Sequence, residues 1–115
     1  MSITRYQTGK KLSRIVEHAG IVYLCGQVAL DYSGNIVQQT QEVLARIDAH
    51  LAEAGTHKSK MLTATIYIKD TADIPAMNEI WCAWLEDCAP PSRTCVRADM
   101  AQDNILVEIT VTAAL

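Results

Sequence analysis

The sequence lacks the features that mark a membrane, nucleic-acid or zinc-finger protein. Its uninterrupted apolar runs are only a few residues long, so we expect no membrane span. The 10 Lys and Arg residues form no cluster and the net charge is −3, which makes nucleic acid a poor candidate partner. The four cysteines form no CxxC pair, and no Cys/His pair has finger spacing, so we expect no metal site.

Two more absences bear on the compartment. The opening stretch MSITRYQTGKKLSR contains no apolar segment of the kind found in secretory signal peptides. Without a secretory context, the widely spaced cysteines are typical of free thiols in a reducing compartment: Cys25, Cys82, Cys88 and Cys95. We therefore expect a cytoplasmic protein.

Length and composition indicate a single globular domain over residues 1–115. Half of the residues are hydrophobic and 20% are charged, and no linker, repeat or low-complexity stretch divides the chain. A chain of 115 residues is long enough to bury a hydrophobic core.

The spacing of apolar residues predicts a two-layer α+β domain. Alternation and helical periodicity place the elements in this order: a strand over 21–30, a helix over 38–54, a strand over 61–69, a helix between Asp73 and Ala89, and strands over about 92–99 and 105–113. A weaker strand is expected before residue 20, and Gly55 is expected to end the first helix. This order favours two helices on one face of a sheet. The histidines fall in loop-like or polar-helix contexts and are expected to be exposed: His18, His50 and His57.

Alternation along the strands predicts two unlike sheet faces. The helix-covered face is expected to collect the apolar residues Val22, Leu24, Val28, Leu30, Leu62, Ala64, Ile66, Ile68, Val96, Ile105, Val107, Ile109 and Val111. The other face is expected to be mixed, with Tyr23, Cys25, Gln27, Thr63, Thr65, Tyr67, Arg93, Cys95, Leu106, Glu108 and Thr110. A solvated face is the simpler interpretation. Because apolar and neutral residues outnumber charges there, we favour a subunit interface whose polar members line a site.

Arg93 and Glu108 are the most informative residues, since a buried charge is costly without a partner. They lie in the segments PPSRTCV and VEI, which we treat as hairpin neighbours. Charge pattern alone favours a structural salt bridge between them. The functional alternative is that Arg93 clamps a ligand carboxylate while Glu108 orients a water. Cys95 is more typical of a small buried hydrophobe than of a nucleophile, because no histidine lies nearby in sequence to activate it.

Several segments together resemble the RidA (YjgF) family, and in particular a short, compact subgroup of it. They are Cys25-Gly26-Gln27, the helix QTQEVLARIDAHLAEAG, the stretch TATIYIKDTADIPAMNEIW, Pro91-Ser92-Arg93-Thr94-Cys95-Val96 and LVEITVTAAL, in that order. The resemblance implies a chorismate-mutase-like α+β fold with a mixed six-stranded sheet. It also implies a homotrimer whose sheets form a central barrel, with a site in each cleft between adjacent subunits.

The activity that the resemblance implies is hydrolysis of reactive 2-imino acids, formed from 2-aminoacrylate or 2-aminocrotonate enamines, to 2-oxo acids and ammonia. In this interpretation Arg93 binds the substrate carboxylate, Glu108 positions the water, and Cys95, Asn78 and Gln27 contact the ligand. The reaction needs an anchor, an oriented water and a dry pocket, but neither cofactor nor metal. Leu12 stands where archetypal members carry a tyrosine, and Cys25 replaces their serine.

Two other function classes remain open from sequence. The same cleft could hold a small carboxylate without turnover, as a binding or chaperone-like module. A reactive-thiol protein would instead depend on Cys95. Ribonuclease activity is disfavoured by the acidic balance and the absence of a basic stripe.

Overall fold

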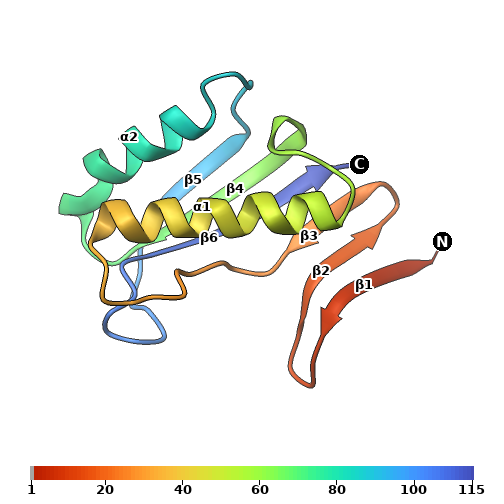
Figure 1. Ribbon diagram of the computed structural model, residues 1–115, viewed down its shortest axis with the longest axis horizontal. Coiled ribbons are helices and arrows are strands. Elements are labelled where there is room, and N and C mark those ends of the chain that lie inside the picture. The colour runs from red at the N-terminus through yellow and green to blue at the C-terminus, as the bar shows by residue number, and fades with distance from the viewer. Residues whose placement is uncertain (1) are drawn as a thin grey trace.

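A computed structural model describes residues 2–115 of the protein as two helices packed on one face of a six-stranded sheet (Figure 1). The elements are β1 (Ile3–Thr8), β2 (Ser13–His18), β3 (Ile21–Leu24), α1 (Ile36–Glu53), β4 (Met61–Ile68), α2 (Ile74–Trp84), β5 (Ser92–Arg97) and β6 (Val107–Ala114). The sheet order is β1-β2-β3-β6-β4-β5, in which only the β4–β5 pair is parallel. The predicted α+β class and mixed sheet are confirmed.

The prediction that β5 and β6 form a hairpin is wrong. Strand β4 lies between them, parallel to β5 and antiparallel to β6. The reason is α2, which connects β4 to β5 as a crossover and therefore returns the chain parallel to β4. The loop after β5 then carries the chain past β4 before β6 begins (Figure 1).

Helix α1 begins and ends at the signals that its sequence carries. A capping box joins Asn35 and Gln38 at its start, and Gly55 adopts a φ of +84° after its end, where glycine is favoured. A stripe of four apolar residues along the helix is buried: Val43, Leu44, Ile47 and Leu51. Neither α1 nor any other helix within residues 2–115 is long and apolar enough to cross a bilayer.

A buried glutamine on α1 ties down the loop that precedes β6. The Gln39 side chain donates to the carbonyl oxygens of Gly34 (3.0 Å) and Asn104 (2.9 Å) and accepts from the backbone N–H of Leu106 (2.9 Å). Gln39 is 1% exposed, so these bonds replace the water that its amide loses on folding. They hold the start of β6 in place against α1.

Most of the predicted apolar face is buried, but Val28 is half-buried and three other members are exposed. Leu30, Leu62 and Val96 are 74%, 43% and 41% exposed. Leu30 lies beyond the end of β3. Leu62 lies at an irregularity in the pairing of β4 with β6, which brings Met61 to the buried face in its place. Val96 pairs with Tyr67 and therefore lies on the uncovered face.

His50 is buried rather than exposed, contrary to expectation. It falls on the inner side of α1 with Ile47 and Leu51 and is 8% exposed. Its burial, with smaller contributions from the charges of Arg46 and Arg14, lowers the pKa of His50 below the ordinary value of 6.5, and Glu53 opposes the shift only in part. The folded protein therefore holds His50 in its neutral form.

A neutral buried His50 predicts that stability falls as the pH falls through 6.5. Below that pH the unfolded chain binds a proton that the folded protein resists, so the unfolded state is favoured. We expect the unfolding free energy, measured in urea, to drop more for wild type than for His50→Gln between about pH 7.5 and about pH 5.5. His18 and His57 are present in both proteins, so any contribution they make to the drop is the same in each and cancels in the comparison. An equal drop in the two proteins would contradict the assignment.

Candidate active site

Arg93 and Cys95 lie on the helix-covered face of the sheet, not on the mixed face. In the parallel β4–β5 register Arg93 is opposite Ala64 and Cys95 is opposite Ile66. Residues opposite each other on neighbouring strands point to the same face. Ala64 and Ile66 are 2% and 0% exposed beneath the helices, so Arg93 and Cys95 point toward the helix layer.

Helix α2 holds the Arg93 guanidinium at the edge of the sheet. Its Nη1 donates to Asn78 Oδ1 over 2.7 Å, and its Cζ lies 5.7 Å from the centre of the Trp81 ring. Because β5 is an edge strand, Arg93 itself remains exposed. Asn78, Trp81, Arg93 and Cys95 together are called the arginine half-site below.

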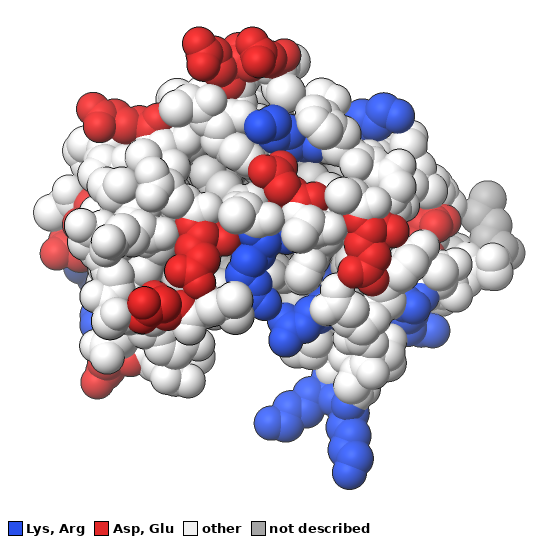
Figure 2. Space-filling view, in the orientation of Figure 1, with Lys and Arg blue, Asp and Glu red and all other residues white. Residues whose placement is uncertain are grey.

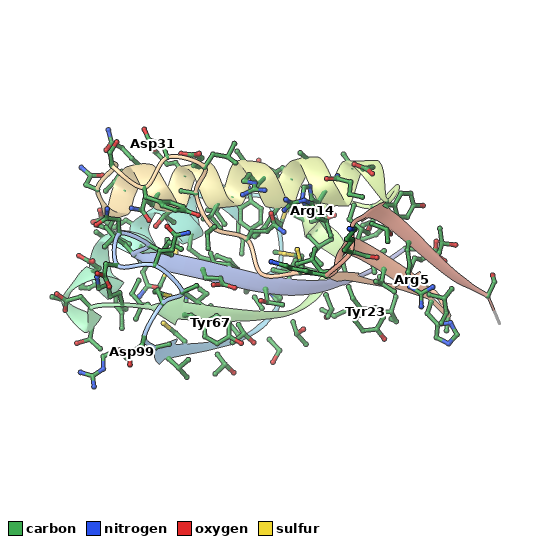
Figure 3. The ribbon with its side chains drawn as sticks, turned by 90° about the horizontal axis from the view of Figure 1, so that it is seen from below. Arg5, Arg14, Tyr23, Asp31, Tyr67 and Asp99 are labelled. Carbon is green, nitrogen blue, oxygen red and sulfur yellow. The ribbon has the colours of Figure 1, made fainter. Side chains whose placement is uncertain are left out.

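Glu108 lies on the opposite, uncovered face. It is paired with Tyr67 of β4, and Figure 3 shows Tyr67 and Tyr23 on the side of the sheet away from α1. Glu108 lines a hollow of about 290 Å³ that is bordered by Tyr67, Thr110 and the loop residues 98–101. Asp99 of that loop also lies below the sheet in Figure 3.

Gly26 allows the Glu108 carboxylate to lie directly against the backbone. A Cβ at position 26 would lie 2.0 Å from Glu108 Oε2, which no side chain could tolerate without displacing the carboxylate. This contact forms because the regular β3–β6 pairing stops after β3, and the chain rejoins β6 through a bridge between Gln27 and Ile109. Glu108, Tyr67, Gly26 and the hollow are called the glutamate half-site below.

The predicted mixed face placed the Gln27 side chain beside Glu108, but the structure places Gln27 on the opposite, helix-covered face. Its bridge partner Ile109 is fully buried on the helix side, and Gln27 is 1% exposed. Its Nε2 donates to the carbonyl oxygen of Cys25 (3.0 Å) and contacts Cys25 Sγ at 3.2 Å. Gln27 therefore supports the backbone of the Cys25–Gly26 segment from inside the fold.

The structural salt bridge that charge pattern favoured is absent. No ion pair joins Arg93 and Glu108 within the described chain, because their strands flank β4 and their side chains lie on opposite faces. Leu12 is 51% exposed at the turn between β1 and β2, beside a hollow that Lys10, Lys11 and Arg14 also line.

Sequence reasoning missed the contacts that Trp81 makes with Arg93 and Gly26 makes with Glu108. Trp81 stands three residues after Asn78, a helical spacing that could have revealed it.

The contact between Gly26 and Glu108 predicts energetic coupling between the two positions. Gly26→Ala should destabilise the protein by about 1 kcal/mol, because the new methyl group displaces the carboxylate. In a Glu108→Ala background the same change should cost less than about 0.5 kcal/mol, since the obstructing atoms are gone. A double-mutant cycle by urea unfolding measures the coupling. Equal costs in both backgrounds would show that the contact does not constrain Glu108.

Comparison with known proteins shows which family the chain matches. The chain matches the model of the Endoribonuclease L-PSP family over residues 2–115. It is 41% identical to a RutC family protein of Haemophilus ducreyi, over 98% of this chain and 97% of that protein. Among solved structures, a YjgF family member from Neisseria meningitidis is 38% identical, with a TM-score of 0.92 over 99% of this chain and 95% of the other. A Rid family protein from Yersinia pestis is 28% identical, with a TM-score of 0.91 over 99% and 100%.

Proposed function

This chain belongs to the Endoribonuclease L-PSP family, and from that premise we propose that it hydrolyses reactive 2-imino acids to 2-oxo acids and ammonia. The observation that carries the proposal is the state of Arg93. Its guanidinium is exposed, is held by two neutral side chains, and has no carboxylate partner among residues 2–115. A fixed, unneutralised guanidinium is suited to a small carboxylate ligand.

The two half-sites lead us to propose that the active site is shared between subunits. A small imino acid must touch its anchor and its water at the same time. Within one chain, Arg93 and Glu108 lie on opposite faces and are separated by β4, so one subunit does not present both to one ligand. We therefore propose a homotrimer in which the arginine half-site of one copy meets the glutamate half-site of the next.

The uncovered sheet face provides a surface for that assembly. Three large side chains on or beside it are strongly exposed in the isolated chain: Tyr23 (45%), Leu62 (43%) and Val96 (41%). Covering these side chains with a second copy would remove apolar surface from water, which favours association. The face carries both this apolar surface and Glu108, so assembly and completion of the site would occur together.

In the proposed reaction Arg93 pairs with the substrate carboxylate and Cys95 forms the pocket wall beside it. Glu108 accepts a hydrogen bond from a water and directs its oxygen at the imine carbon. Addition of the water forms a C–O bond, and a proton passes through Glu108 to the nitrogen. The hydroxyl proton of the tetrahedral amino alcohol then moves to the nitrogen, the C–N bond breaks as the C=O bond forms, and ammonia and the 2-oxo acid are released. The chemistry balances without any cofactor.

An RNA substrate is less well supported by the surface. Acidic and basic side chains are interspersed over the helix-bearing face in Figure 2, and the net charge is −3. Proteins that bind RNA neutralise a run of phosphates with a continuous basic surface. The unneutralised Arg93 favours a small anion instead.

The carboxylate anchor predicts a large effect of Arg93→Ala on hydrolysis. We expect kcat/KM to fall by the equivalent of roughly 2–5 kcal/mol, since a bidentate pair is lost. The assay couples the protein to threonine dehydratase and follows the disappearance of the imine. Arg97→Ala is the matched control, because Arg97 is an exposed arginine on the same strand. A wild-type protein that binds 2-oxobutanoate without shortening the lifetime of the imine would instead favour a non-catalytic binding module.

A shared site predicts complementation between two inactive variants. Arg93→Ala and Glu108→Gln homotrimers should each be inactive, because every site lacks one group. When the two are unfolded together in equal amounts and refolded, every mixed trimer contains one intact site. Random assembly should then restore about a quarter of the wild-type activity. No recovery from refolded, trimeric mixtures would mean that one chain supplies both groups.

A further inference from the structure

The Arg93 guanidinium is held by two residues of α2 that carry no charge. Asn78 and Trp81 stand three residues apart and so lie on the same side of the helix. Asn78 Oδ1 accepts a hydrogen bond from Nη1 over 2.7 Å, while the Trp81 ring lies 5.7 Å from Cζ. Trp81 is 4% exposed, so its ring is a rigid part of the core beneath an exposed cation.

Neither contact neutralises Arg93, which distinguishes this arrangement from a salt bridge. A carboxylate partner would satisfy the guanidinium and leave little attraction for a ligand. An amide oxygen and an aromatic face instead restrict its rotation while preserving its full charge. Arg93 is therefore oriented without a negatively charged partner.

The atom that Asn78 contacts also decides which edge of the guanidinium is free. Nη1 is engaged, whereas no side chain of residues 2–115 bonds to Nε or Nη2. The Nε–Nη2 edge presents two parallel N–H groups, which match the two oxygens of a planar carboxylate. A ligand that approaches this edge therefore meets a preformed, flat, bidentate donor.

We infer that Trp81 is a positioning residue for Arg93, and that Trp81 and Asn78 together hold the guanidinium with its Nε–Nη2 edge open to a planar carboxylate. The inference deepens the proposed function, because it explains how the anchor of that site is oriented. Trp81 acts through Arg93 and need not touch the substrate.

A second tryptophan packs against the Trp81 ring. The Trp84 ring lies 5.5 Å from Trp81 at an interplanar angle of 52°. Trp84 is itself anchored, since its Nε1 donates to Asp48 Oδ2 on α1 over 2.9 Å and Lys58 Nζ lies 5.2 Å from the centre of its ring. Trp84 thus links the aromatic pair to α1, whereas the Arg93 guanidinium lies over the Trp81 ring.

The test measures binding of 2-oxobutanoate by calorimetry alongside the imine hydrolysis assay. Trp81→Leu should raise both Kd and KM by roughly 3- to 30-fold with a much smaller change in kcat, since it removes a cation–π contact. Trp81→Phe should recover most of the loss, because it restores an aromatic face. Asn78→Asp should weaken binding by at least about tenfold, because the new carboxylate neutralises Arg93 while the side chain keeps its shape. Trp84→Phe keeps an aromatic ring against Trp81, so it should change Kd far less than Trp81→Leu does.

Two results would overturn the inference. One is a folded Trp81→Leu or Asn78→Asp protein that binds 2-oxobutanoate as wild type does. The other is an equal loss in Trp84→Phe, which would reduce Trp81 to a general packing role. If Trp81→Leu does not fold, Trp81→Phe and Asn78→Asp still decide the question. Failure of the hydrolase proposal is separate: a wild type that binds 2-oxobutanoate with the expected dependence on Trp81, yet leaves the imine intact, supports the inference and contradicts the activity.

Discussion

The register of β4 against its two neighbours is the constraint on which the rest of the structure depends. Strand side chains alternate, so one register assigns every residue of β5 and β6 to a face. Parallel pairing places Arg93 beside Ala64 under the helices, and antiparallel pairing places Glu108 beside Tyr67 on the uncovered face. A slip of one residue would move Glu108 beneath the helices if β6 slipped, and would move Arg93 away from α2 if β5 slipped. The buried apolar residues of β4 and β6 therefore fix the two half-sites on opposite faces.

Each half-site presents its charged group in a different way. Arg93 is oriented by the amide of Asn78 and the ring of Trp81, both neutral, and keeps its charge available. The Glu108 carboxylate lies against the backbone of Gly26, where the absence of a Cβ leaves room for its Oε2. Both arrangements use fixed neighbours rather than opposite charges, so neither group is neutralised before a ligand arrives. Such preorganisation lowers the entropy cost of assembling a site.

Sequence reasoning found the helices and the residues of the candidate site, but it misjudged where three of these residues point: Arg93, Cys95 and Gln27. Arg93 and Cys95 were grouped with Glu108 because all three fell on one phase of an assumed hairpin. The crossover through α2 removed that hairpin. Leu62 was misplaced because a pairing irregularity breaks the alternation of β4, and His50 because its position on the inner side of α1 outweighs the polar residues around it. In each case the local spacing of residues was read correctly, but contacts with residues far away in the chain decided which way the side chain points.

The sequence by itself determined which segments become helices and strands, since spacing, caps and glycine positions act locally. It also indicated Arg93 and Glu108 as candidate site residues, since a charge among apolar residues is costly without a partner, and the family resemblance added Asn78. Only the tertiary structure decided that these residues form two half-sites on opposite faces, and that Trp81 lies beneath the guanidinium. Those relations depend on strand order and register, which arise from contacts between residues far apart in the chain, and no local pattern contains them.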